Sequence, residues 1–166
     1  MVTFNEAVKA GKVTLEEAEQ LFDSLPAVKP EELRGLWKGE SFATGSPLDG
    51  GLEKSGWYGK EFIDNDKVHP LVFKSNSNGR FNVNPVKILH LQNDVYLPDV
   101  QSDVETDQPT ARIRVVEYRG VPTASMVYNE RPIIDSFRKV DENTVLGSME
   151  NPELPVPYFF VLRRET

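Results

Sequence analysis

The chain has no cysteine and only two histidines among its 166 residues, and these absences exclude several kinds of site. Without cysteine there is no disulfide framework, no thiol nucleophile and no zinc or iron–sulfur site with cysteine ligands. His69 and His90 alone cannot form a histidine cluster. We therefore predict that the chain holds no metal ion.

Recognisable catalytic motifs are missing as well. The sequence contains no Gly-x-Ser-x-Gly elbow, no His-Glu-x-x-His and no Gly-x-Gly-x-x-Gly. Gly59 and Lys60 are followed by Glu61 and lack the preceding glycine of a phosphate-binding loop. We assign no catalytic residue from motifs, although acid–base work by a carboxylate stays open.

Positive charge is scarce, with 19 basic against 26 acidic residues and a net charge of −7. Such a chain repels phosphate backbones, so nucleic acid is not an expected partner. The composition, 39% hydrophobic and 27% charged, is typical of a folded domain that does not span a membrane. The start MVTFNEAVKAGK has neither the apolar core nor the cleavage site of a secretory signal. We expect a cytoplasmic protein.

The first thirty residues carry the pattern of a helical arm. Thr14 followed three residues later by Glu17 matches a capping box, which predicts the start of a helix. Apolar residues then recur at helical spacing, at Leu15, Ala18, Leu21, Phe22 and Leu25. A shorter amphipathic segment spans residues 4–10. We predict that residues 1–30 form a helical arm and that its apolar face covers another part of the chain.

Residues 31–166 have the pattern of a single, mainly β domain, because apolar residues alternate and turn clusters recur at short intervals. About ten strands are predicted, at 35–43, 52–63, 68–74, 79–84, 86–92, 111–118, 123–128, 133–140, 144–149 and 158–164. An open sheet of this size would leave long unpaired edges. We therefore expect a closed antiparallel barrel, with a two-sheet sandwich as the alternative. The longest connection, 98–109, is a candidate lid or portal.

The most distinctive local pattern is Gly35-Leu36-Trp37-Lys38-Gly39, in the first predicted strand. Alternation places Gly35, Trp37 and Gly39 on one face. Glycines beside a tryptophan allow a strand to bend and the indole to lie against the backbone. We interpret Trp37 as closing and packing the base of the barrel, and as a residue that also contacts a bound ligand.

This pattern resembles the first strand of calycin barrels, which include lipocalins, fatty-acid-binding proteins and nitrobindins. In those families an Arg or Lys from the last strand contacts the tryptophan, and here the last strand ends in Arg163 and Arg164. The segments 33–39, 56–60, 132–141 and 158–164 resemble a bacterial and fungal family with a GXWXG signature, whose second half is a domain of unknown function. The resemblance implies a calycin-like fold but no activity.

Nitrobindins hold haem through a histidine, so the resemblance leaves open a haem site at His69 or His90. Neither residue lies in a nitrobindin motif. We therefore predict no cofactor and keep haem as an alternative.

A carboxylate is predicted inside the barrel. Alternation in the segment Ile133-Ile134-Asp135-Ser136-Phe137 puts Asp135 on the same face as Ile133 and Phe137. A buried carboxylate is costly unless it is paired or hydrogen-bonded. The candidate partners are cations on neighbouring strands, namely Arg112, Arg114, Arg163 and Lys87. Asp135 is either a structural ion pair or a polar anchor for a ligand.

Ten strands enclose more space than side chains fill, so a cavity is expected. The residues predicted to line it are Trp37, Trp57, Phe73, Met126, Tyr128, Asp135, Phe137, Phe160 and Arg163. We predict that the interior binds a hydrophobic or amphipathic, lipid-like small molecule. The alternatives are a cavity enzyme with Asp135 as acid or base, a haem-binding barrel, and an interaction module whose arm docks a partner. The sequence leaves the oligomeric state open.

Overall fold

The computed structural model describes residues 1–92 and 94–166. The chain begins with two helices, α1 (Phe4–Ala10) and α2 (Leu15–Ser24). Each starts with a capping box, formed by Thr3 with Glu6 and by Thr14 with Glu17. Both helices lie where the sequence predicts them, because the capping residues satisfy the first free N–H groups of each helix.

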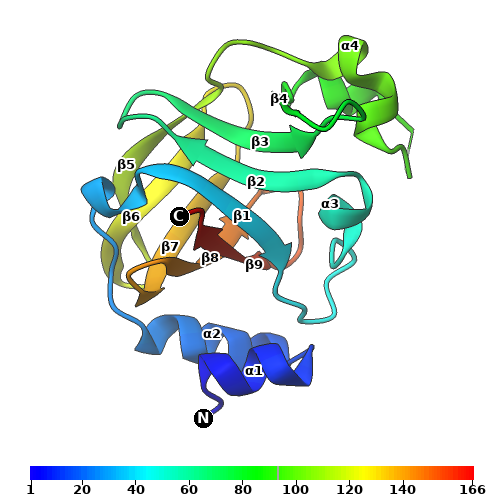
Figure 1. Ribbon diagram of the computed structural model, residues 1–166. Coiled ribbons are helices and arrows are strands. Elements are labelled where there is room, and N and C mark those ends of the chain that lie inside the picture. The colour runs from blue at the N-terminus through cyan, green and yellow to red at the C-terminus, as the bar shows by residue number, and fades with distance from the viewer. Residues whose placement is uncertain (93) are drawn as a thin grey trace.

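The rest of the chain is mainly β. Nine strands occur in the described residues: β1 (Gly35–Ser41), β2 (Trp57–Phe62), β3 (Val68–Lys74), β4 (Arg80–Asn82), β5 (Ala111–Tyr118), β6 (Val121–Tyr128), β7 (Ile134–Asp141), β8 (Thr144–Glu150) and β9 (Tyr158–Arg164). All are paired antiparallel, in the order β2-β1-β9-β8-β7-β6-β5-β3-β4. An additional β2–β3 pairing joins the sheet to itself, so every strand except β4 belongs to one ring, here called the strand ring (Figure 1).

The strand ring is narrowly joined at one place, between β3 and β5. The only register pair there, within the part of the chain that the structure describes, is Val68 with Ala111. Pro70 follows in β3 and has no N–H to donate, and β3 continues by pairing with β4 instead. We call this junction the seam.

The described residues between β4 and β5, 84–92 and 94–110, lie beside β3 and β4 (Figure 1) and are here called the cap segment. It contains short helical turns, η2 (Lys87–His90), η3 (Leu97–Val100) and α4 (Gln101–Val104). Its Leu97 and Val104 are buried in the same apolar cluster as the inward-facing residues of the ring. The cap segment therefore covers part of the interior.

Three sequence predictions are wrong in this region and its surroundings. The predicted strand 86–92 is not a strand, because Lys87–His90 form the helical turn η2; before it, Asn84 accepts from the N–H of Val86 at 2.8 Å. The predicted strand 52–63 begins only at Trp57, after the short helix α3 (Gly51–Lys54). The predicted loop 98–109 contains η3 and α4. A further helical turn, η1 (Pro30–Leu33), precedes β1.

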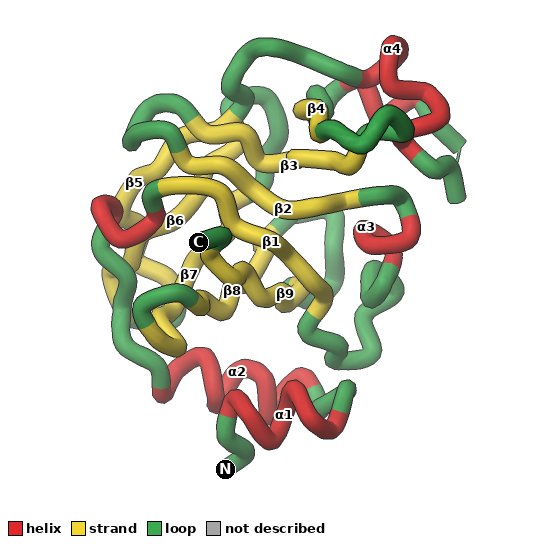
Figure 2. The backbone as a smooth tube through the Cα atoms, in the orientation of Figure 1, coloured by secondary structure: helices red, strands yellow, loops and turns green. Residues whose placement is uncertain are grey.

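The helical arm packs against the outer face of the strand ring (Figures 1 and 2). Phe22 of α2 meets Phe159 of β9 edge to face, with 6.0 Å between ring centroids, and Phe4 of α1 stacks on Phe42. The apolar face of the arm therefore covers this chain's own sheet, as expected. Among the residues described, no helix is long and apolar enough to cross a bilayer.

Arg138 of β7 attaches the end of α2 to the ring. Its Nη1 donates to the carbonyl oxygens of Phe22 at 2.9 Å, Asp23 at 3.2 Å and Leu25 at 2.9 Å. Its guanidinium also lies 4.7 Å from the centroid of the Phe22 ring. A positive charge at the C-terminus of a helix satisfies carbonyl groups that have no partner within the helix. Arg138 therefore caps the C-terminus of α2 with a side chain from the sheet.

We expect the substitution Arg138→Ala to lower the free energy of unfolding by about 3 kcal/mol, since it removes charged hydrogen bonds from buried carbonyl groups. Arg163→Ala is the matched control, because Arg163 makes an exposed ion pair with Glu40 and should cost less than about 1 kcal/mol. Urea unfolding of both variants measures the difference. Equal effects in the two variants would contradict the role given to Arg138.

Candidate functional site

Aromatic side chains meet in the middle of the strand ring. Phe160 of β9 lies 5.9 Å from Phe137, 6.3 Å from Trp57 and 6.0 Å from Tyr158, measured between ring centroids. Phe62 continues the group at 6.1 Å from Phe137. The structure thus brings together three of the residues predicted to line the interior, Trp57, Phe137 and Phe160. Much of the interior next to them is filled by rings packed edge to face.

A buried ion pair lies next to these rings. The Nζ of Lys60 on β2 is 3.2 Å from Oδ2 of Asp135 on β7, and the two side chains are 4% and 1% exposed. Lys60 also donates to the carbonyl oxygen of Pro70 at 3.1 Å. Alternation predicts the inward position of Asp135 correctly, and Ile133 and Phe137 are buried with it.

None of the predicted partners of Asp135 is its partner in the structure. Arg112 bonds to Asn129, Arg114 pairs with Asp66, Lys87 bonds to the carbonyl oxygen of Glu105, and Arg163 pairs with Glu40, all at exposed positions. These cations lie on the outward faces of their segments.

The inward position of Lys60 follows from an irregularity in β2. Trp57 and Phe62 both belong to the interior cluster, although they are an odd number of residues apart. The register between β2 and β3 shifts on either side of Gly59, and such a bulge changes which face the following residues occupy. Strict alternation from Trp57 places Lys60 outside. The glycine within the strand is the signal that could have revealed the bulge.

Aromatic faces surround the Lys60 ammonium. Its Nζ lies 5.3 Å from the ring centroid of Phe160, 5.7 Å from Trp57 and 5.8 Å from Tyr128. A cation at this distance from a ring face is attracted by the negative centre of the ring. The surroundings of the amine are therefore dry, and the ring faces offset only part of the water lost from its charge.

Burial shifts the pKa values of Lys60 and Asp135 toward each other, because it favours the uncharged form of each group. Desolvation lowers the pKa of Lys60 below 10.5 and raises that of Asp135 above 3.8, while the opposite charge of the partner counteracts each shift. Burial also raises the pKa of the neighbouring Tyr128 phenol well above 10.0. Oδ1 of Asp135 is buried and has no hydrogen-bond partner among the described residues. The pair thus offers one acceptor without a partner, on a carboxyl group whose pKa is raised beside an amine whose pKa is lowered.

The other predicted lining residues occupy different parts of the interior. Met126 is fully buried and lies opposite Asp135 in the β6–β7 register. Phe73 packs against Phe81 of β4, with 6.1 Å between ring centroids. Trp37 is buried, and its Nε1 donates to the carbonyl oxygen of Arg34 at 3.3 Å.

The arginine that contacts Trp37 is Arg164, whose guanidinium lies 4.2 Å from the centroid of the indole. Arg164 also donates to the carbonyl oxygens of Arg34 and Glu32. Arg163, which we predicted as a lining residue, points outward instead. The two residues are neighbours in β9, so alternation allows only one of them to reach Trp37.

The glycines beside Trp37 have separate roles. Gly35 has a φ of +99°, a conformation that side chains with a Cβ rarely adopt. A Cβ on Gly39 would lie 2.1 Å from the ring of Trp57. The space at Gly39 is therefore occupied by the indole of β2, and not by that of Trp37 in its own strand. The motif lets a ring that borders the ion pair lie directly on β1.

We expect Gly39→Ala to lower the free energy of unfolding by about 3 kcal/mol, because the added methyl group overlaps the Trp57 ring. The control is Gly51→Ala in α3, where a Cβ would meet nothing within 4 Å and the effect should stay within about 0.5 kcal/mol. Thermal unfolding with tryptophan fluorescence compares the variants. A Gly39→Ala protein as stable as the control would contradict this packing.

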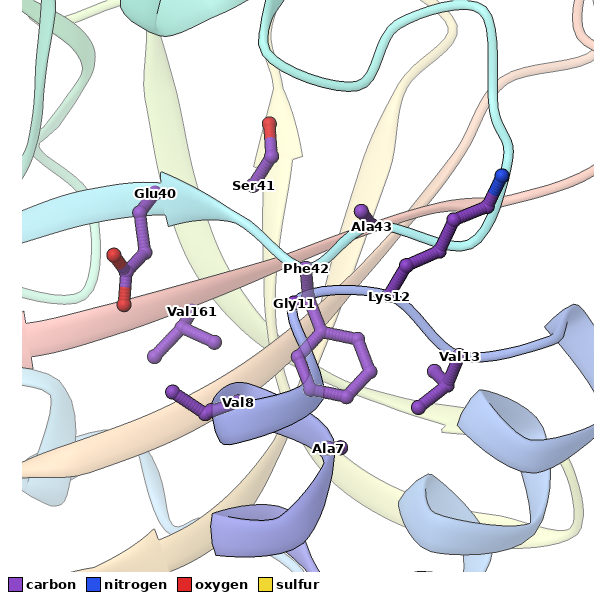
Figure 3. A pocket seen from close by; sticks show the side chains of 10 residues that line it. All are labelled: Ala7, Val8, Gly11, Lys12, Val13, Glu40, Ser41, Phe42, Ala43 and Val161. Carbon is purple, nitrogen blue, oxygen red and sulfur yellow. The ribbon is translucent and has the colours of Figure 1, made fainter.

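Surface pockets lie outside this interior. One of about 210 Å³ lies between α1 and β1, where Val8 and Phe42 supply apolar walls and Lys12 and Glu40 supply charges (Figure 3). Another, of about 360 Å³, includes Trp57 in its lining. Neither has the buried polar pair that distinguishes the interior.

The two histidines are far from equivalent. His90 is exposed on η2, whereas His69 is buried opposite Glu61 of β2, and burial lowers its pKa below 6.5. Among residues 1–92 and 94–166 there is no group of three or more His, Asp or Glu side chains placed to hold a metal ion.

Comparisons with known proteins agree with the sequence motifs. Residues 20–78 match the family model described as GXWXG protein, and residues 109–164 match the domain of unknown function DUF4334. A crystal structure of a protein from Thermomonospora curvata superimposes with a TM-score of 0.76 and 31% sequence identity, over 98% of this chain and 95% of that chain. A comparison with curated proteins finds no match. Trp37 and Arg164 lie in the two matched regions.

Proposed function

We propose that this chain, which belongs to the family of GXWXG proteins, binds a small amphipathic molecule inside a calycin-like barrel. The closed order of the strands and the contact between Trp37 and Arg164 support the calycin-like interpretation. The ligand's polar end would meet Lys60 and Asp135. Its apolar part would lie against aromatic side chains of the interior.

The observation that carries this proposal is the buried pair itself. Removing an ammonium and a carboxylate from water costs several kcal/mol for each ion, and well-packed apolar residues often serve stability equally well. Here one carboxylate oxygen also lacks a hydrogen-bond partner within the described chain. Orphaned buried polar groups are rare in folded proteins. A ligand that donates a hydrogen bond to Asp135 Oδ1 would satisfy this oxygen.

The chemistry of the site selects the ligand class. A hydroxyl group can donate to Asp135, and its oxygen can accept from Lys60. Met126, Phe137 and Phe160 would then bury the rest of a small apolar or aromatic molecule. The acidic surface, with a net charge of −7, disfavours polyanionic ligands.

Access would be through the seam. The strands β3 and β5 share a single register pair, and two backbone hydrogen bonds cross there, from Thr110 N–H to Val68 O at 3.1 Å and from Ile113 N–H to Asn65 O at 2.7 Å. The cap segment beside β3 would move to admit the ligand, as lids over binding sites do. The aromatic side chains next to Lys60 would then shift to make room.

Native mass spectrometry of the protein purified from its own host tests the proposal. We expect a small molecule at one copy per chain, and denaturation should release it for identification. The double variant Lys60→Met with Asp135→Leu should lack it, while its unfolding free energy stays equal or rises, because it replaces the buried pair by apolar groups of similar size.

Arg163→Ala is the control, since this exposed residue should leave the bound molecule in place. The proposal is rejected if the wild-type protein has its apo mass as purified and takes up no benzyl alcohol, 1-decanol or decanoic acid when these are added. Retention of the bound molecule by the double variant would place the site elsewhere.

A second candidate function, a cavity enzyme, is favoured by the opposite pKa shifts of Lys60 and Asp135. Acid–base catalysis requires groups that gain and lose protons near neutral pH, and burial moves both groups in that direction. Asp135→Asn should then abolish turnover of the released molecule while its binding persists. Binding in this variant with no turnover by the wild type would leave simple binding as the function.

A further inference from the structure

We propose that Lys60 is a nucleophile toward aldehydes and ketones, and that it forms an imine with a carbonyl ligand inside the strand ring. This inference rests on the proposed function, because the ligand must first reach the interior. It adds a chemical class of ligand and a covalent step to that function. Neither follows from the family motifs.

The position of Lys60 suits an amine that must be in its neutral, nucleophilic form for part of the time. Its surroundings are aromatic faces at 5.3 to 5.8 Å, which solvate an ammonium poorly compared with water. Within the described part of the chain, its polar contacts are Oδ2 of Asp135 and the carbonyl oxygen of Pro70. Desolvated lysines of this kind are activated as nucleophiles toward carbonyl carbon.

Asp135 is placed to carry the proton. Its Oδ2 is 3.2 Å from the amine, so a proton can pass from the ammonium to the carboxylate and leave a neutral pair. Its second oxygen, Oδ1, is buried without a partner in the part of the chain that the structure describes. When the carboxyl group carries its proton on Oδ1, it can donate a hydrogen bond to the oxygen atom of a carbonyl ligand. One carboxyl group can therefore serve both the nucleophile and the group it attacks.

The first step forms a carbinolamine. The Lys60 nitrogen uses its lone pair to bond to the carbonyl carbon, and the C=O π electrons move to oxygen. That oxygen takes the proton from the Asp135 carboxyl group and becomes a hydroxyl. The nitrogen, now positively charged, returns one proton to the Asp135 carboxylate. The neutral carbinolamine and the carboxylic acid hold the same atoms and charge as the starting pair with the ligand.

The second step releases water. The nitrogen lone pair forms the C=N bond, the C–O bond breaks, and the hydroxyl leaves with the proton of Asp135. The products are a protonated imine, the Asp135 carboxylate and one water molecule. The new cation stands where the ammonium stood, so the ion pair and the aromatic contacts of Lys60 are kept. The same surroundings that hold the lysine thus stabilise its imine.

Reductive trapping tests the inference. The wild-type protein is incubated with benzaldehyde and cyanoborohydride, which delivers hydride to the C=N bond and leaves a benzyl group on the lysine. Peptide mapping by mass spectrometry then follows each lysine with time. We expect Lys60 to be labelled at least about tenfold faster than exposed lysines, because its amine is deprotonated more readily than theirs. Cyanoborohydride without aldehyde should give no adduct.

Matched variants distinguish a change in the labelling of Lys60 from a failure of the protein to fold. Lys38→Met removes an exposed lysine of β1 and should leave the labelling of Lys60 unchanged. Asp135→Asn should slow the labelling by at least about tenfold, since the proton carrier is lost. The double variant Lys60→Met with Asp135→Leu removes the amine without leaving a buried unpaired charge. It should fold and give no interior adduct.

Benzyl alcohol, which has no carbonyl group, separates this inference from the proposed function. Its binding seen by native mass spectrometry, together with an unlabelled Lys60, would overturn the imine and leave the binding function standing. Labelling of Lys60 no faster than that of Lys38 would also overturn the imine. If Lys60 is not labelled, and the wild-type protein has its apo mass as purified and takes up no benzyl alcohol, 1-decanol or decanoic acid, both proposals fail.

Discussion

An ammonium and a carboxylate share the dry interior of this protein, and the arrangement around them depends on keeping that pair together. Lys60 and Asp135 come from β2 and β7, which are far apart in the order of the sheet. Their contact exists only because the sheet closes on itself. Aromatic rings exclude water from the pair and face the ammonium. The core is therefore organised around a polar centre as well as around apolar packing.

The residues of the family signature support this centre from one side. Gly39 leaves room for the indole of Trp57, and that indole is one of the walls around Lys60. Trp37 closes the neighbouring part of the interior with Arg164 stacked on it. These contacts give a physical reason for two glycines around a tryptophan. One glycine adopts a positive φ, and the other accepts a ring from the next strand.

The outer face of the strand ring packs against the helical arm. Phe22 and its apolar neighbours cover β8 and β9, and Arg138 ends α2 by binding its last carbonyl groups. The apolar face of the arm is thus occupied within the chain, which weakens the idea that it docks a partner. The helices α1 and α2 are separated from the interior by the sheet. Changes in one should affect the other only through the strands.

Much of the fold could be predicted from local patterns. The capping box at Thr14 predicts α2, the amphipathic pattern of residues 4–10 predicts α1, and alternation of apolar residues predicts most strands and the inward position of Asp135. The strand predicted at 86–92 was wrong because a run of apolar residues in a short segment fits a helical turn equally well. Tertiary surroundings decide between the two.

The sequence by itself therefore determined where α1, α2 and most strands lie, and which face most of their residues occupy. Only the tertiary structure decided that Lys60 meets Asp135, that Arg164 and not Arg163 reaches Trp37, and that Gly39 makes room for another strand's indole. The reason is physical. Local patterns depend on the backbone period of one element, whereas contacts across a ring depend on register, and a single bulge moves a side chain to the opposite face.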